Sequence, residues 1–113
     1  MERSSRGTLG QASRYLNRAY IQPRALADAD DAATWHERQR PGLGIEFILE
    51  LDAAIERAAG TPEAYARQYR DARRLLLRRF PYAVYFLFED GTVEIFAVLH
   101  QHRNSSSWQS RLP

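Results

Sequence analysis

The stretch 75–99 most constrains what this chain can fold into, because it holds nearly all of the strongly strand-forming residues. The segments 82–88 (YAVYFLF) and 92–99 (TVEIFAVL) are rich in β-branched and aromatic side chains, which favour strands. The dipeptide Asp-Gly at 90–91 is typical of the tight turn that joins two antiparallel strands, since both central residues need φ > 0. Odd and even positions in both segments are largely apolar, so we expect a central strand pair that other elements cover.

The preceding half of the chain predicts two helices joined by a short turn. Small apolar residues recur at helical spacing along 24–39, and Pro23 suits a first helical turn. A second helix is predicted over 43–59, with Gly60 and Pro62 marking its end. Its apolar stripe consists of Phe47, Ile48, Leu51, Ala54, Ile55 and Ala58. Because the connection PGLG is only four residues long, the two helices should pair antiparallel.

Two further strands and a linker complete the predicted order. Residues 18–22 predict a short strand before the helices, and 73–80 predict a strand before the hairpin. Between the helices and that strand, 61–70 is expected to be a linker with room for one helical turn, in which Tyr65 and Tyr69 would be four residues apart. After the hairpin we expect a polar loop and a short helical tail.

The predicted fold class is therefore α+β, a small antiparallel sheet packed against an N-terminal α-helical hairpin. The expected order is strand, helix, helix and three strands, with the short C-terminal helical tail last. At 113 residues the chain is long enough for one modest core. Residues 1–17 are polar and without a clear period, so we expect a flexible N-terminal extension followed by a single domain over 18–113.

Composition narrows the classes of function. The chain has no cysteine, which excludes disulfides and thiolate metal sites, and no apolar run approaches the roughly 18 residues that span a bilayer. We therefore expect a cytoplasmic protein without membrane contact and without a cofactor. The net charge is only +2, and all sixteen basic residues are arginine. Codon bias explains this without any functional role, whereas the planar guanidinium also suits phosphate and carboxylate recognition.

The end of the last strand carries the most catalytic-looking group. His100, His102 and Arg103 could act as a general acid and base on RNA, or contact a target. The His-x-His spacing also suits zinc, but no third ligand lies nearby in sequence. A solvated polar loop is the plainer interpretation, and we predict no metal site.

Three other groups leave alternatives open. The arginines 73, 74, 78 and 79 either face solvent and pair with acidic helices, or form a nucleic-acid footprint. The aspartates 28, 30 and 31 are better explained as a solvated first helical turn than as a metal cluster. Tyr65, Tyr69 and Trp35 either line an apolar groove for a partner's amphipathic segment or belong to the core.

Taken in order, the motifs at 40–44 (RPGLG), 73–85 (RRLLLRRFPYAVY) and 95–100 (IFAVLH), followed by Arg103 and Trp108, resemble the RelE/ParE superfamily of bacterial toxins. The resemblance runs from about residue 19 to residue 112. It implies the fold predicted above, and a place in a type II toxin–antitoxin module that serves, for example, plasmid stabilisation. One departure is His36, where many members carry tyrosine; we expect it to pack rather than to act as a ligand.

The superfamily holds two chemistries, and the nuclease chemistry fits this chain poorly. Its RelE-like branch cuts messenger RNA in the ribosome with basic residues on the central strands and a C-terminal tyrosine. By strand-to-strand matching, the sheet arginine of those nucleases falls on Ala83, and one of their two lysines falls on Leu76. The other lysine falls roughly on Arg74, and the tyrosine falls near Trp108, whose indole transfers no proton in a useful pH range.

The likeness is stronger to the ParE branch, whose members inhibit DNA gyrase without hydrolysis of their own. The resemblance thus implies a gyrase inhibitor that is neutralised in a hetero-oligomer by an antitoxin, expected to be of the ribbon-helix-helix type. Its expected target-binding residues are His100, His102, Arg103, Trp108 and Arg111. Its expected antitoxin-binding residues are Trp35, His36, Phe47, Leu51, Tyr65, Tyr69 and Arg73.

Two alternatives stay open. One is a ribosome-dependent endoribonuclease with a remodelled site built from Arg74, Arg79, His102 and Arg103. The other is a non-toxic relic that only binds its antitoxin and regulates their operon.

Overall fold

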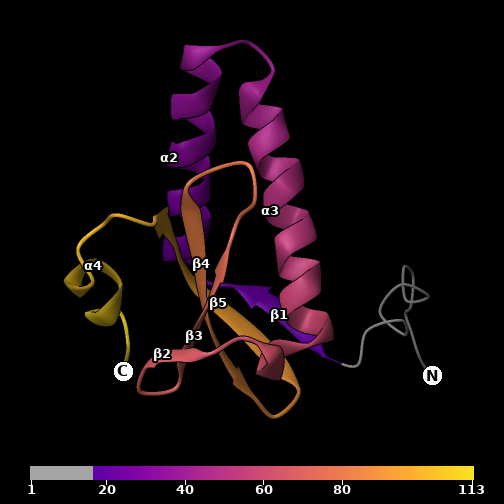
Figure 1. Cartoon of the computed structure of the whole chain (residues 1–113), viewed down its shortest axis with the longest axis vertical. Coiled ribbons are helices and arrows are strands. Elements are labelled where there is room, and N and C mark those ends of the chain that lie inside the picture. Colours follow the sequence, from indigo (N-terminus) through magenta and orange to yellow (C-terminus); the bar gives the residue numbers. More distant parts are fainter. Residues whose placement is uncertain (1–16) are drawn as a thin grey trace.

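The computed structural model describes residues 17–113 and has the predicted α+β class (Figure 1). The expected N-terminal extension lies outside the described residues except for Asn17, whose Nδ2 donates to the carbonyl of Ala59 over 2.9 Å. The helices and strands, in chain order, are β1 (Arg18–Ile21), α2 (Pro23–Gln39), α3 (Leu43–Gly60), the 3-10 turn η1 (Pro62–Ala64), β2 (Arg67–Tyr69), β3 (Ala72–Leu76), β4 (Tyr82–Glu89), β5 (Thr92–His100) and α4 (Ser106–Gln109).

The five strands form one mixed sheet in the order β1-β5-β4-β3-β2. The predicted hairpin is present, with β4 and β5 antiparallel and Asp90 and Gly91 at φ values of 52° and 73°. β1 pairs with β5 in parallel, so the sheet is not wholly antiparallel as expected. This parallel pair joins segments that are far apart in the sequence, because both long helices lie between β1 and β5 along the chain.

Two expectations about the segment before the hairpin were wrong. Residues 61–70 were expected to be a linker, but they contain η1 and the additional edge strand β2, so Tyr65 and Tyr69 do not share a helix. The strand expected over 73–80 ends at Leu76. Beyond it the Glu50 carboxylate of α3 accepts the backbone N–H groups of Arg78 and Arg79, the latter over 2.9 Å, so these two groups bond to the helix and not to a strand.

The two long helices run side by side in Figure 1 and form the predicted antiparallel hairpin. Two glycines permit the turn. Gly42 lies at φ 92°, in the left-handed region, and a Cβ on Gly44 would approach the Ala33 carbonyl to 2.7 Å. The Glu37 carboxylate accepts the N–H groups of Gly42 and Gly44, which lowers its pKa.

The sheet has two covered faces. The hairpin face carries the main core, in which Phe47, Leu51 and Ala54 of α3 pack on Val84, Phe86, Ile95 and Val98 of the sheet. The opposite face carries a smaller cluster, which consists of Ala72, Ala83, Tyr85, Phe96, Ala97, Leu99 and Trp108. A register shift in the β4–β5 pairing, between Tyr85 and Phe86, lets Phe96 and its neighbour Ala97 both join this second cluster.

An ion pair closes the edge of β5 beyond the end of β1. Asp28 of α2 accepts the Val98 N–H over 3.0 Å, and Arg111 Nη1 donates to the Phe96 carbonyl over 3.1 Å. The Arg111 and Asp28 side chains contact each other at 2.6 Å and are only 10% and 13% exposed. The expectation that Asp28 belongs to a solvated first turn was therefore wrong: the helix begins at Pro23, and Asp28 one turn later faces the sheet edge.

Candidate functional site

The predicted residues at the end of the last strand lie together on the surface. His100 ends β5, and the His102 backbone N–H donates to His100 Nδ1 over 3.2 Å, so this nitrogen serves as an acceptor. The two imidazole centroids are 5.3 Å apart. His102 and Arg103 are exposed, which leaves both side chains available to a macromolecule.

This surface continues onto the helical hairpin through a small pocket of about 190 Å³. Its lining includes Trp35 of α2, Tyr82 of β4, His100 and Arg103. Trp35 is 54% exposed. Burial raises the pKa of the Tyr82 phenol, with Arg103 acting in the opposite direction, so Tyr82 stays protonated at neutral pH. The pocket offers aromatic faces, a phenol donor and the Arg103 guanidinium, and Asp28 and Asp31 of α2 also line it.

Behind the pocket the aromatic residues continue into the core. The His36 ring stacks on Phe47 at 5.2 Å, meets Phe80 edge-on at 4.9 Å, and lies 2.7 Å through Nδ1 from the Ala32 carbonyl. His36 is 6% exposed, Phe47 is fully buried and Leu51 is 4% exposed. These three, expected to contact an antitoxin, lie beneath the surface and shape it from below.

Two of the expected target-binding residues are also inside. Trp108 is 5% exposed, and its ring stacks on Tyr85 at 4.5 Å with an interplanar angle of 17°. Arg111 forms the ion pair with Asp28. Both fix the C-terminal tail against the sheet, and neither presents a free polar face beside His102 and Arg103.

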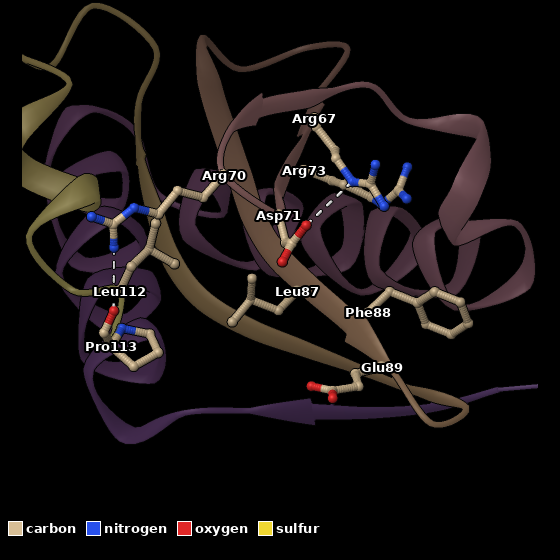
Figure 2. A pocket seen from close by; sticks show the side chains of 9 residues that line it. All are labelled: Arg67, Arg70, Asp71, Arg73, Leu87, Phe88, Glu89, Leu112 and Pro113. Carbon is tan, nitrogen blue, oxygen red and sulfur yellow. Dashed lines mark hydrogen bonds and ion pairs between the residues drawn. The ribbon is translucent and has the colours of Figure 1, made fainter.

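The remaining antitoxin candidates lie around the β2–β3 end of the sheet. Arg73 Nη1 donates to the Tyr65 carbonyl over 2.7 Å, and the Tyr65 ring contacts Phe86 edge-on at 6.0 Å. Tyr69 is 37% exposed, with its ring 6.3 Å from that of Trp108. Figure 2 shows the pocket next to them, where Arg67 and Arg73 lie close together.

The four residues of the nuclease alternative do not form one cluster. Arg74 alternates with Leu75 of the hairpin-side core, and its register partner Tyr85 belongs to the opposite face. Arg79 pairs instead with Glu46 of α3 at 2.6 Å. Arg79 is thereby tied to the hairpin, whereas Arg74 lies on the face that α4 covers.

Three exposed apolar residues of the helical hairpin were not predicted as part of a site. Leu26 of α2 is 51% exposed, and Ile45 and Leu49 of α3 are 65% and 63% exposed. A groove of about 490 Å³ is lined by Ile45 and Ile48 of α3 and by Ala33 and Arg38 of α2. The sequence did contain a sign of this surface. Ile45 and Leu49 are four residues apart, so they share a face of α3, and neither belongs to the predicted core stripe.

Two other features are absent from the residues that the structure describes, and both concern other kinds of site. Within residues 17–113, no group of three histidine, cysteine, aspartate or glutamate side chains is arranged to hold a metal ion. Over the same residues, no helix is both long and apolar enough to cross a membrane.

Comparisons with known proteins agree on the kind of protein this chain resembles. A family model described as the ParE toxin of the type II toxin–antitoxin system, parDE, matches residues 20–105. A solved structure titled as the chromosomal ParDE TA system from P. aeruginosa is similar with a TM-score of 0.67 and 15% identity, covering 75% of this chain and 96% of that chain. At that identity the structural likeness shows the fold alone. No curated protein matches the sequence.

Proposed function

The chain belongs to the ParE toxin family of type II toxin–antitoxin systems, and we propose on that premise that it inhibits DNA gyrase when its antitoxin is absent. It would act by binding, without a hydrolytic step of its own. The proposed gyrase target rests on the resemblance to the ParE branch. A toxin that acts on gyrase would work in the cytoplasm.

The packing under α4 supports binding over RNA cleavage. Ala83, at the position of the sheet arginine in the nucleases, is fully buried, and Trp108, near their tyrosine, is stacked on Tyr85. Phosphodiester cleavage needs cations beside the phosphate and a group that takes the 2′-OH proton. Buried alanine and tryptophan side chains supply neither.

The proposed target surface is the end of β5 and the loop that follows it. His102 and Arg103 are exposed there, and behind them the rings of His100 and Tyr82 lie 5.5 Å apart. Trp108 and Arg111 would contribute by holding the tail that anchors this loop. They are positioning residues in this proposal, and the contacts belong to His102 and Arg103.

The antitoxin would cover the hairpin. An amphipathic segment of the antitoxin, carried on a ribbon-helix-helix protein in a hetero-oligomer, would lay its apolar side chains on Leu26, Ile45 and Leu49. Trp35 lies on the other side of α2 and would be contacted by a separate part of the antitoxin. Tyr65, Tyr69 and Arg73 would extend the interface toward β2. The buried His36, Phe47 and Leu51 would support that surface from below.

Induced expression of the chain without its antitoxin tests the target directly. We expect DNA synthesis, measured by pulse labelling, to collapse with an SOS response while protein synthesis continues. The double variant His102→Ala, Arg103→Ala should lose this arrest. Arg24→Ala, an exposed arginine on α2, is the control and should arrest DNA synthesis like the unmodified chain.

Each other outcome favours a different function. Early loss of translation with cleaved messages would overturn gyrase inhibition in favour of the endoribonuclease, with His102 and Arg103 as catalytic residues. Normal growth with confirmed soluble protein would overturn toxicity and leave only antitoxin binding and regulation of the operon.

A further inference from the structure

An open pocket of about 460 Å³ lies at the β2–β3 end of the sheet (Figure 2). Its cations are Arg67 of β2, Arg70 in the turn and Arg73 of β3; its carboxylates are Asp71 and Glu89. Leu87 and Leu112 supply apolar contact between the charged groups. The pocket thus holds three guanidinium groups against two carboxylates.

Two of these arginines stand opposite each other in the strand register. Arg67 is the partner of Arg73 in the β2–β3 pair, and like charges directly opposite each other destabilise a strand pair. Arg67 and Asp71 form an ion pair at 3.6 Å, but both side chains are more than half exposed. This ion pair therefore does little to offset the repulsion between the two arginines. An arriving anion would relieve the repulsion between the two guanidiniums.

The third arginine is held beside an exposed aromatic ring. Arg70 lies at φ 53°, a left-handed conformation that is strained for a side-chain-bearing residue. Its guanidinium carbon is 5.1 Å from the centroid of the Tyr69 ring, and its Nη1 donates to the Pro113 carbonyl over 3.3 Å. Arg70 and Tyr69 together form a flat, exposed cation–aromatic pair at the rim of the pocket.

We propose that the pocket formed by Arg67, Arg70 and Arg73 binds the phosphodiester backbone of a single-stranded nucleic acid, with an unstacked base on the Arg70–Tyr69 pair. Guanidinium groups bind phosphate oxygens through two parallel hydrogen bonds. An acidic peptide would use the same arginines, but the adjacent aromatic ring favours a ligand that carries bases. The pocket is open to solvent, which suits a passing backbone better than a small enclosed nucleotide.

This inference stands apart from gyrase inhibition, because nucleic-acid binding is measured without gyrase. The test uses the full chain, freed from its antitoxin and refolded, with a short fluorescein-labelled oligothymidine and fluorescence anisotropy across a salt series. Each phosphate contact contributes about 0.7 to the slope of log affinity against log salt for single strands.

The double variant Arg67→Gln, Arg73→Gln should therefore lower that slope by about 1.4. Because Arg73 also bonds to the Tyr65 carbonyl, the single variant Arg67→Gln provides a measurement that leaves this bond intact, with an expected loss of about 0.7. Tyr69→Ala should weaken binding roughly tenfold without changing the slope. Arg24→Gln, Arg38→Gln, which removes the same charge from exposed positions of α2, is the control and should leave the slope unchanged.

Four results would overturn the proposal. The first is that neither single-stranded DNA nor RNA binds, and the second is that the control double variant lowers the salt slope equally. The third is that duplex DNA binds as tightly as single strands. The fourth is that poly-glutamate binds more tightly than oligothymidine and depends on the same arginines. Single-stranded DNA and RNA are separate arms, and binding of either supports the site. A gyrase supercoiling assay on the same preparations separates the two proposals, since inhibition without nucleic-acid binding would remove only this one.

Discussion

The two faces of the sheet are built in different ways. The hairpin face is covered by two helices of 17 and 18 residues, whose side chains form one continuous core with the strands. The other face is covered by α4, which has 4 residues, and by the C-terminal tail. That tail is held by the Trp108–Tyr85 stack and by the Arg111–Asp28 ion pair. The hairpin face should determine the global stability of the domain. The face that α4 covers should determine where the loop after β5 lies.

The largest expected difference between the faces comes from truncating one aromatic residue on each. Phe47→Ala should cost about 3–5 kcal/mol of unfolding free energy, because the hairpin and sheet cannot collapse into the vacated volume. Trp108→Ala should cost about 3 kcal/mol, the low end of the range, because the short tail can detach locally. Urea denaturation gives both values, and hydrogen exchange should show lost protection confined to the tail in Trp108→Ala. Global loss of protection in that variant would show that the two faces form one cooperative unit.

The ion pair offers the next largest effect. Arg111→Met leaves Asp28 mostly buried without its cation, which should cost about 3 kcal/mol. The double variant Asp28→Leu, Arg111→Met should regain part of that loss. It should not regain all of it, since Val98 N–H and Phe96 C=O would lose their partners, at about 1 kcal/mol or more each. If thermal unfolding showed that the double variant is as stable as the unmodified chain, the two hydrogen bonds to the edge of β5 would contribute nothing to stability.

A change within the hairpin should have a smaller effect. Gly44→Ala would drive its Cβ against the Ala33 carbonyl, so the helices must separate at their turn, at about 2 kcal/mol. Gly60→Ala meets no neighbouring atom within 4 Å and is the matched control. It should be neutral or slightly stabilising, since alanine favours the helix. Equal melting temperatures for the two variants would contradict a close helix–helix contact at Gly44.

The smallest expected effect is the pH dependence of the hairpin turn. The N–H groups of Gly42 and Gly44 lower the pKa of Glu37 from its usual 4.5. The folded state thus holds the Glu37 proton less tightly than the unfolded state. The resulting stability is present above about pH 4.5 and is lost as the pH falls through the lower folded-state value.

Glu37→Gln should therefore flatten the acid limb of stability against pH below about 4.5, as followed by thermal melts. Glu63→Gln, at an exposed position of η1, is the matched control. An acid limb unchanged in Glu37→Gln would show that the turn gains nothing from the charged form.

The parts of the fold that were predictable carry strong local signals. The Asp-Gly turn at 90–91 and the β-branched and aromatic residues on both sides of it predicted the hairpin, and the apolar stripe of 47–58 predicted the second helix. β2 escaped notice because its three residues, Arg67, Gln68 and Tyr69, are all exposed and show no alternation. β1 was placed correctly along the chain, but its parallel partner depends on contacts across both helices.

The candidate site was predictable only where it is exposed and local. His100, His102 and Arg103 follow one another in the chain, so their proximity was implied by their spacing. The burial of Trp108 and Arg111 depends on contacts with residues that are distant in the sequence. Arg111 and Asp28, for example, are separated by 83 positions. No periodicity reveals such a contact, and both residues had been assigned to the target surface. Tyr65 and Tyr69 were grouped on a helical turn that η1 and β2 replace.

The most direct test of gyrase inhibition is a DNA-cleavage assay with purified gyrase, relaxed plasmid and the antitoxin-free chain, stopped with detergent and protease. We expect linear plasmid to accumulate with the unmodified chain and to disappear when the antitoxin is added. The variant His102→Ala, Arg103→Ala should yield no linear plasmid. Unaffected supercoiling and no linear plasmid from soluble, folded toxin would contradict gyrase as the target.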